Sequence, residues 1–458
     1  MLPGDRLKSC VLVISICGYG NRYFYLYRSV WVTVFIIYNE PLFKKVIFVI
    51  IIPMKKSKYR HIDYAKTQMG TFISFANSLA FEKYIYPNNI KILCCLHVTK
   101  ETGVFVEWLN AKGFNIDLVA SNPLSTDEQV KSELEDVGIK VFTTTDGSMA
   151  NLKKIWKIAL KNKPDYLIDD GGDLVELSGK LKINSIKGCC EETTSGVIKE
   201  NFLQKNNTLS FPVIAVNNAK TKNLMDNHFG TAQSVLDGII RSTNEIIAGK
   251  NILVCGYGHC GSGIADRAKG LGANVMISEI NEIKALQALY DGFEVNSFDM
   301  IYKKADIIIT ATGCINVVDK KHFSNFKNGC ILVNAGHSDC EINVKSLYSS
   351  HKVNKCMPHY EEFNNNGKRL ILLGNGRIIN LIAANGHPSE IMSLSYSSQI
   401  AGLFYLLNSK GLTNNIYQLP SIMENKIASI HLNNRSIMLT KLSSEQKKYL
   451  NSYYENFE

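Results

Sequence analysis

A glycine-rich run between an apolar segment and a helical segment limits the fold of this chain more than any other feature. Gly256-Tyr257-Gly258-His259-Cys260-Gly261 follows an expected strand over residues 252–255 and opens an expected helix over residues 263–270. The first glycine permits a tight turn, the second lets the backbone approach a pyrophosphate, and the third packs helix on strand. The helix N-terminus offers free N–H groups to phosphates. The run predicts a dinucleotide site.

An acidic residue is found where such a site needs one. Glu279 follows the next expected strand, residues 274–278, and can accept hydrogen bonds from the adenosine ribose hydroxyls. Because a carboxylate there repels a 2′-phosphate, we expect NAD rather than NADP. A glycine-rich turn without a ligand is the alternative.

Short apolar runs alternate with helical stretches in two separate series. The first spans residues 90–168, and the second begins at residue 251. Strands separated by helices predict parallel sheets whose ligands gather at the carboxyl ends of the strands. We expect an α/β protein with two doubly wound parallel-sheet domains, a substrate domain and an NAD-binding Rossmann domain. A helical pattern over residues 230–248 is the candidate hinge helix between them.

The expected division of the chain has five parts. Residues 1–53 form an atypical extension outside the fold, 54–229 the first part of the substrate-binding domain, 230–384 the Rossmann domain, 385–440 the returning part of the substrate-binding domain, and 441–458 a C-terminal tail. Apolar runs in residues 1–53 are interrupted by charges and do not reach the roughly 18 residues of a spanning helix. Met54 is the candidate start, and a membrane-associating segment is the alternative.

Charge and cysteine content exclude some functions. The net charge is +10, but residues 1–60 hold ten Lys or Arg against two acids and so account for +8 of it. The balanced remainder predicts no nucleic-acid partner. Twelve cysteines without paired Cys-x-x-Cys units indicate reduced thiols and a cytoplasmic protein rather than a zinc site.

Several polar clusters allow two interpretations each. The run Asp169-Asp170-Gly171-Gly172-Asp173 is typical of a divalent-metal site or of an acidic turn. The stretch 191–195 is typical of a helix cap. Lys222 and Asp226 are four residues apart, as in an ordinary surface ion pair. Isolated histidines are more often structural than catalytic, and no histidine spacing suits a metal, so we expect no metal ion.

Together these motifs resemble the adenosylhomocysteinase family, over about residues 62 to 450. The resemblance is carried by residues 95–102, 121–126, 169–174, 191–197, 216–222, 226–227, 256–263, 336–337 and 380–389. The Asn-Ala-Lys-Thr-Lys run and the cysteine after Gly-Tyr-Gly-His are most similar to the short-tailed archaeal and thermophilic-bacterial branch.

The resemblance implies reversible hydrolysis of S-adenosyl-L-homocysteine to adenosine and L-homocysteine. Transient oxidation of the ribose 3′-hydroxyl by one tightly bound NAD per subunit acidifies the C4′ hydrogen. Homocysteine then leaves by elimination, water adds, and the ketone is reduced again. A homo-oligomer, tetramer or dimer, is implied by analogy, with a small nucleoside thioether as substrate and no membrane partner.

The resemblance also implies roles for individual residues. Lys222 would be the base at the 3′-oxygen, its pKa lowered beside the nicotinamide, and Asp226 would flank the ribose hydroxyls. His97 and Asp170 would serve C4′ and C5′, with His337 close by. Further substrate contacts would come from Thr99, Glu101, Glu192, Met392 and Tyr396. NAD would be held by Thr193, Thr194, Ser195, Asn227, Gly256, Gly258, His259, Cys260, Gly261, Ser262, Gly263, Glu279, Thr312, Ala335, Gly336, His337, Asn380 and His387.

Departures from the family pattern leave room for a different activity. Asn385 stands beside the purine where Met or Glu is common, and residues 143–147 lack the family's aromatic-basic-Gly-Glu run. These two features favour a related purine thioether such as S-inosyl-L-homocysteine. A 2-hydroxyacid dehydrogenase with the same NAD domain and a nucleoside-binding protein without turnover also fit the NAD motif.

Overall fold

The structure is a computed structural model that describes residues 60–79, 89–144, 146–365 and 367–455. Every described residue belongs to one compact unit, Arg60–Glu458. The expectations for residues 1–53 and for a start at Met54 therefore lie outside the described residues. Across the described ranges, we find no helix with the length and apolar character needed to cross a membrane.

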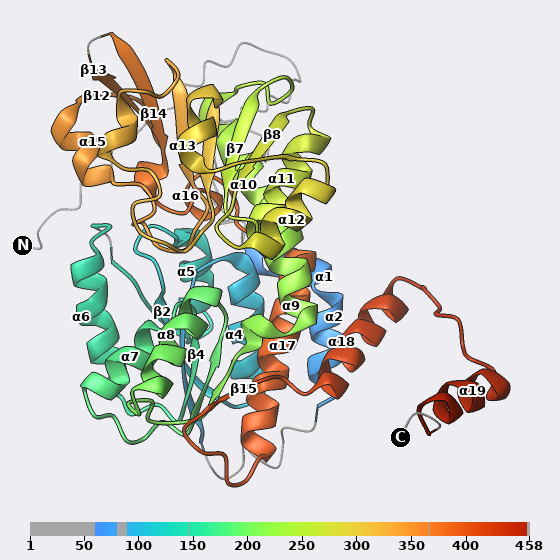
Figure 1. The fold of residues 1–458 in the computed structure, drawn as a ribbon. Helices are drawn as coiled ribbons and strands as arrows, with labels where there is room; N and C mark the ends of the chain where they lie inside the picture. The colour runs from blue at the N-terminus through green and yellow to red at the C-terminus, as the bar shows by residue number, and fades with distance from the viewer. Residues whose placement is uncertain (1–59, 80–88, 145, 366, 456–458) are drawn as a thin grey trace, which may run out of the picture. The chain divides into compact units, whose positions relative to one another are not determined.

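The first sheet has seven parallel strands in the order β15-β6-β5-β4-β1-β2-β3 (Figure 1). They are β1 (Lys91–Leu96), β2 (Asn115–Ala120), β3 (Lys140–Phe142), β4 (Tyr166–Asp169), β5 (Gly188–Glu191), β6 (Val213–Ile214) and β15 (Ile416–Tyr417). The chain builds β1 to β3 toward one edge and then crosses to β4 on the other side of β1. The topological switch point thus lies between β1 and β4, where ligands bind in open α/β sheets.

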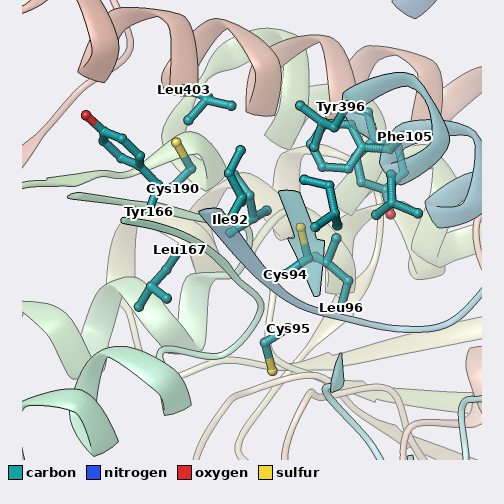
Figure 2. Packing of buried hydrophobic residues seen from close by; sticks show 14 of the residues in the cluster. Ile92, Cys94, Cys95, Leu96, Phe105, Tyr166, Leu167, Cys190, Tyr396 and Leu403 are labelled. Atoms are coloured by element: carbon teal, nitrogen blue, oxygen red, sulfur yellow. The ribbon is translucent and has the colours of Figure 1, made fainter. Parts of the chain in front are cut away.

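Helices cover this sheet because their apolar faces match the strands. They are α1 (His61–Gln68), α2 (Gly70–Asn77), α4 (Lys100–Ala111), α5 (Glu128–Glu135), α6 (Met149–Leu160), α7 (Asp173–Lys180), α8 (Thr194–Lys205), α17 (Ser389–Asn408) and α18 (Ser421–Asn434). Phe105 of α4 and Tyr396 of α17 stack with ring centroids 4.6 Å apart. Figure 2 shows this pair beside Cys94 of β1, in the core that also contains Cys190 and Leu403.

The second sheet has eight strands in the order β12-β13-β14-β11-β10-β7-β8-β9. They are β7 (Asn251–Cys255), β8 (Asn274–Ser278), β9 (Glu294–Val295), β10 (Ile307–Thr310), β11 (Cys330–Asn334), β12 (Lys352–Met357), β13 (Tyr360–Asn365) and β14 (Lys368–Leu373). Six neighbouring strands of this sheet, β14-β11-β10-β7-β8-β9, are parallel and have the strand order of a Rossmann fold. Its switch point lies between β7 and β10.

One edge of the second sheet differs from the expected all-parallel arrangement. Strands β12, β13 and β14 are antiparallel neighbours. The connections are too short for the helical crossover that parallel strands need, so the chain must reverse. His359 has φ 62° in the first of these turns, and Gly367 has φ 83° in the second.

The segments between the two sheets are helical. The short α9 (Lys220–Lys222) leads into the π-helix η2 (Asn223–Gly230), which continues as α10 (Thr231–Thr243). Helix α10 is shorter than the expected 230–248, because Asn244 adopts a left-handed conformation with φ 52° and ends it. The C-terminal tail contains a helix, α19 (Ser444–Glu455).

Candidate active site

Lys222 is the centre of a buried polar cluster at the start of η2. Its Nζ lies 2.9 Å from Oδ2 of Asp226 and 3.4 Å from Oε1 of Glu192. It also donates hydrogen bonds to Oδ1 of Asn227 at 2.8 Å and to Oδ1 of Asn217 at 3.2 Å. Lys222 is 3% exposed, and among the described residues no other Lys or Arg is buried. The interpretation of Lys222 and Asp226 as a surface ion pair is therefore wrong.

The charges in this cluster depend on one another. Burial disfavours the ammonium of Lys222, but Asp226 and Glu192 outweigh burial and raise the pKa of Lys222 above its usual value. Burial would raise the pKa of Asp226, yet His387 and Lys222 hold it well below its usual range. Burial raises the pKa of Glu192, and Lys222 offsets part of that rise. The lowered pKa expected for Lys222 would thus need a positive charge from a ligand, because the chain's own groups act in the opposite direction.

His387 links Asp226 to the loop before α17. Its Nδ1 is hydrogen-bonded to Oδ1 of Asp226, and its Nε2 lies 3.1 Å from Nδ2 of Asn380 and 3.3 Å from Oγ1 of Thr231. Asn380 belongs to α16 (Ile379–Ile382), and within the described part of the chain its buried Oδ1 has no hydrogen-bond partner. The network therefore ties together η2, α10, α16 and the segment that returns to the first sheet.

A second cluster lies at the switch point of the first sheet. Nε2 of His97 lies 3.2 Å from Oδ2 of Asp170, and Nδ1 of His337 lies 3.9 Å from Oδ1 of the same carboxylate. Oδ1 of Asp170 is buried and has no hydrogen-bond partner among the described residues. His97 Nδ1 lies 2.6 Å from Oγ of Ser125, which orients the ring. Burial lowers the pKa of His97 to about 4 although Asp170 opposes the shift, so His97 is neutral at physiological pH.

These three side chains are also of the types that bind metals. The possible ligand atoms of His97, Asp170 and His337 lie within 4.8 Å of one another. No other three His, Cys, Asp or Glu side chains in the described part of the chain lie as close together. Asp170 and Lys222 interact electrostatically, as do His97 and His387. The two clusters therefore face a common region, where proton transfer is the chemistry that they support.

The acidic run that carries Asp170 is a turn held by backbone hydrogen bonds. Asp169 accepts hydrogen bonds from the N–H groups of Asp170 at 3.1 Å, Leu174 at 2.9 Å and Val175 at 3.1 Å. Gly171 has φ 114°, which favours glycine, and a Cβ there would lie 2.7 Å from Nε2 of His337. The acidic-turn interpretation is correct for Asp169, while Asp170 is free to point into the site.

The residues expected around the purine belong to α4 and α17. Thr99 caps α4 by accepting from the N–H of Thr102 at 3.3 Å. Glu101 is 1% exposed, and Oε1 accepts a hydrogen bond from Oγ of Ser389. Tyr396 is buried against Phe105 and lies 2.7 Å from Oγ1 of Thr102 through its hydroxyl. Met392 is half-buried against the same core.

The glycine-rich loop between β7 and α11 (His259–Gly270) fits a dinucleotide. A Cβ on Gly256 would lie 2.6 Å from the carbonyl oxygen of Ala311, and one on Gly261 would lie 1.9 Å from that of Gly256. A Cβ on Gly258 would meet only Nζ of Lys284, at 3.8 Å, so space remains open in front of the loop. No side chain caps the helix here, and its first N–H groups are available to a pyrophosphate.

Other candidate cofactor residues lie at neighbouring strand and helix ends. Thr193 caps α8 by accepting from the N–H of Gly196 at 3.1 Å, as the helix-cap interpretation predicts. Glu279 accepts from the N–H groups of Tyr257 at 2.6 Å and Asn281 at 2.9 Å; these bonds outweigh burial and lower its pKa. The rest are on the first turns of α8 and α11, in η2, and after β10 and β11: Thr194, Ser195, Asn227, His259, Cys260, Ser262, Gly263, Thr312, Ala335, Gly336.

Sequence reasoning missed several residues that hold the site together. Glu341 is fully buried and accepts from N and Oγ1 of Thr312 at 2.9 and 2.7 Å and from N of Gly313 at 2.9 Å. Ser395 and Gln399 donate to the two oxygens of Glu192. Asn217 lies within one of the family motifs, but Glu341 follows no recognisable pattern. Only the fold brings it to the β10 loop.

Comparison with known proteins agrees with this arrangement. The family description "S-adenosyl-L-homocysteine hydrolase" matches residues 49–181, and "S-adenosyl-L-homocysteine hydrolase, NAD binding domain" matches residues 227–386. An adenosylhomocysteinase of Saccharolobus solfataricus is 40% identical over 406 residues, which covers 86% of this chain and 95% of the relative. The chain belongs to the S-adenosyl-L-homocysteine hydrolase family. It is therefore a hydrolase, and its second sheet belongs to an NAD-binding domain.

Relatives within the hydrolase family differ in their named substrate. An adenosylhomocysteinase of Gloeothece citriformis is 42% identical and covers 88% of this chain and 95% of its own. An S-inosyl-L-homocysteine hydrolase of Methanocaldococcus jannaschii is 41% identical and covers 87% of this chain and 97% of its own. Overall identity thus does not separate the two substrates, and the side chains of the site must be considered.

Proposed function

We propose that this chain reversibly hydrolyses S-adenosyl-L-homocysteine to adenosine and L-homocysteine. The observation that carries the proposal is the burial of Lys222 between Asp226 and Glu192, in electrostatic contact with Asp170. A buried cation between carboxylates is suited to hold and move protons at a sugar hydroxyl. When bound, NAD would supply reversible oxidation of the ribose 3′-hydroxyl.

Each cluster receives a separate task. Lys222 exchanges the proton of the 3′-oxygen, and Asp226 with Glu192 accepts hydrogen bonds from the ribose hydroxyls. His97, neutral because its pKa is lowered to about 4, takes the C4′ proton or a proton of the water that adds at C5′. The Asp170 carboxylate orients His97 and stabilises the imidazolium that forms, and His337 lies on the other side of that carboxylate.

Residues around the second switch point would hold NAD. The first turn of α11 offers backbone N–H groups to the pyrophosphate, and Glu279 is at the end of β8 for the ribose. Thr312 stands at the end of β10, fixed by Glu341. Asn380, with its unpartnered Oδ1, and His387 complete the set near Asp226.

Glu101 favours an adenine over a 6-oxopurine. Its buried carboxylate accepts hydrogen bonds, and Ser389 already donates to Oε1. A 6-amino group can donate to a carboxylate, whereas a 6-oxo group repels it. Asn385 favours the opposite choice, a 6-oxopurine. Its Oδ1 accepts a hydrogen bond from Nη1 of Arg241 at 3.3 Å, which leaves the amide nitrogen as a donor. Asn385 is exposed, so we assign the greater weight to Glu101.

The domain limits and the setting of the enzyme belong to the same proposal. Residues 54–229 and 385–440 form the substrate-binding domain, which is supported by the pairing of β15 with β6, and residues 230–384 form the NAD domain. Nine cysteines carry free thiols, as in a cytoplasmic protein: Cys94, Cys95, Cys189, Cys190, Cys255, Cys260, Cys314, Cys330 and Cys340. The active form is a homo-oligomer, tetramer or dimer.

The full-length chain provides the test. After purification, the bound cofactor is identified by mass, and homocysteine release from S-adenosyl-L-homocysteine is measured with a thiol reagent. Active protein containing one NAD per subunit is the expected result. Protein loaded with NAD yet inert toward this substrate would indicate a binding protein without turnover. Net NADH formed from a simple hydroxy acid would instead identify a dehydrogenase.

A further inference from the structure

Glu200 of α8 is a buried carboxyl group that the proposed mechanism does not use. Its exposed fraction is 0%, and neither of its oxygens has a hydrogen-bond donor among the described residues. An ionised carboxylate in such a place is strongly unfavourable, because it has lost water and gained no donor. Glu200 therefore needs either a cation or a proton of its own.

The groups around Glu200 supply no free cation. The titratable groups that interact with it are Asp169 at the end of β4, Glu191, Cys189 and Cys190 of β5, and Lys199 of its own helix. Nζ of Lys199 is already bonded to Oδ1 of Asp173 at 2.6 Å. Three buried carboxyl groups thus lie together, and mutual repulsion opposes ionisation of all three.

Counting donors identifies which of the three keeps a proton. Asp169 accepts three backbone N–H groups. Oε1 of Glu191 accepts from the N–H of Gly171 and from N and Oγ1 of Thr193, whereas Oε2 accepts only from the N–H of Gly172. Asp169 and Glu191 are thus acceptors, as ionised carboxylates are. Burial raises the pKa of all three carboxyl groups, but hydrogen bonds from backbone N–H groups oppose that rise at Asp169 and Glu191 and not at Glu200. Burial and Asp169 raise the pKa of Glu200 to about 8, and the carboxyl of Glu191 is its hydrogen-bonding neighbour.

We propose that Glu200 is a positioning residue that keeps its carboxyl proton and shares it with the carboxylate of Glu191, and that this shared proton holds the Gly171-Gly172 turn that presents Asp170. When Glu200 releases the proton to solvent at alkaline pH, a negative charge arises beside Glu191. The repulsion weakens the hold of Glu191 on both glycine N–H groups.

The packing leaves little freedom to absorb that change. A Cβ on Gly196 would lie 2.0 Å from Oε1 of Glu191, so the backbone of α8 rests directly on this carboxylate. On the other side of the turn, a Cβ on Gly171 would lie 2.7 Å from His337. A displacement of Glu191 is therefore transmitted to the turn and to the contact between Asp170 and His97.

Two substitutions distinguish a shared proton from a role of Glu200 in packing alone. Glu200→Gln keeps a donor toward Glu191 and cannot ionise, whereas Glu200→Leu fills the space without a donor. The full chain is assayed for homocysteine release between pH 6 and pH 10; this readout rests on the proposed function. Glu176→Gln, which removes a carboxylate paired with Lys180 on α7, is the matched control.

The expected results differ between the variants. Glu200→Gln keeps kcat within about twofold at pH 7 and loses the decline of kcat that the unmodified protein shows above about pH 8. Glu200→Leu lowers kcat about tenfold with KM nearly unchanged, because the buried carboxylate of Glu191 loses a donor. Glu176→Gln follows the unmodified protein at every pH.

Two further readouts do not need activity. The infrared band of a protonated carboxyl group at pH 7 should weaken in Glu200→Gln. The folded-state pKa of about 8 exceeds the ordinary value of 4.5, so folding takes up a proton between these values. The stability contributed by Glu200 is present below pH 4.5 and lost as pH rises to 8. The Tm of Glu200→Gln relative to the unmodified protein should therefore increase from pH 5 to pH 9.

Opposite outcomes would overturn the proposal. If Glu200→Gln keeps the alkaline decline, the infrared band and the Tm trend of the unmodified protein, Glu200 carries no shared proton. If Glu200→Leu matches Glu200→Gln in kcat and pH profile, Glu200 only fills space. If no variant, nor the unmodified chain, releases homocysteine, the proposed function fails, while the infrared and Tm results still decide the role of Glu200.

Discussion

Lys222 and Asp226 form an ion pair across one turn, with 2.9 Å between Nζ and Oδ2, and both side chains are buried. On an exposed helix such a pair would stabilise the fold by a few tenths of a kcal/mol at most. Here the pair also bonds Glu192 and His387 and thereby joins the two lobes of the site. In the proposed function, this ion pair holds a positive and a negative charge beside a ribose hydroxyl of the substrate.

Replacing Lys222 should stop turnover without unfolding the protein. Because Lys222→Ala removes the group that exchanges the 3′-oxygen proton, kcat should fall by about 10² to 10⁴-fold. Bound NAD, measured by mass, should remain. Lys220→Ala is the matched control, since Lys220 is exposed on the same short helix and should leave kcat unchanged. Full activity in Lys222→Ala would contradict the assignment.

The lowered pKa of His97 predicts a dependence of stability on pH. The folded-state pKa is about 4 against an ordinary 6.5, so the unfolded chain binds more protons between these values. His97 therefore reduces stability progressively as pH falls from 6.5 to 4, by about 2 kcal/mol at pH 5, and has no such effect above pH 6.5. The free energy of unfolding of His97→Asn, relative to the unmodified protein, should thus improve between pH 7.5 and pH 5. His61→Asn, at an exposed histidine, is the control. An unchanged difference at both pH values would show that His97 is not buried neutral.

Two glycines of the dinucleotide loop should respond differently to alanine. Gly261→Ala places a Cβ 1.9 Å from a backbone oxygen, so it should cost about 1–3 kcal/mol and lower the Tm. Gly258→Ala meets only a flexible lysine end at 3.8 Å and should fold normally. It narrows the space in front of the helix N-terminus, so its NAD content should fall. Equal Tm losses in both variants would argue against an open cradle at Gly258.

Glu101 should control the choice of purine. Glu101→Gln adds an amide donor, which can bond a 6-oxo group. The ratio of kcat/KM for S-adenosyl-L-homocysteine to that for S-inosyl-L-homocysteine should fall about tenfold or more, equivalent to roughly 1.4 kcal/mol. Asn385→Glu should move the ratio in the opposite direction. A preference for the inosyl substrate in the unmodified protein would reverse our assignment.

The sequence predicted the parts of the molecule that depend on local pattern. Strands with continuous apolar runs, such as β1 and β7, and the glycine-rich loop were found where expected, because burial on both faces leaves a clear signature. The β12–β13 hairpin was missed, since its exposed edge is polar and its turn contains His359 rather than glycine. The alternation of apolar and polar residues that marks a strand is weak in this hairpin.

Long-range contacts explain what the sequence could not reveal about the site. Glu341 reaches Thr312 only because β10 and β11 are neighbours in the sheet. The pairing of Asp226 with His387 spans 161 residues, and no spacing rule connects them. The family resemblance points to Thr312, Asp226 and His387 one by one, but their hydrogen bonds follow only from the packed structure. The same is true of the positions of Glu341 and of the buried Glu200.

The π-helix η2 makes the site sensitive to the length of the chain. Such a segment holds more residues per turn than an α-helix. Deleting one residue between Asn223 and Gly230 would let the segment wind as α-helix and would change the direction of the side chains that follow. Asp226 and Asn227 could then no longer both face Lys222. This eight-residue stretch should therefore accept substitutions at its exposed positions Leu224 and Phe229, yet reject insertions and deletions.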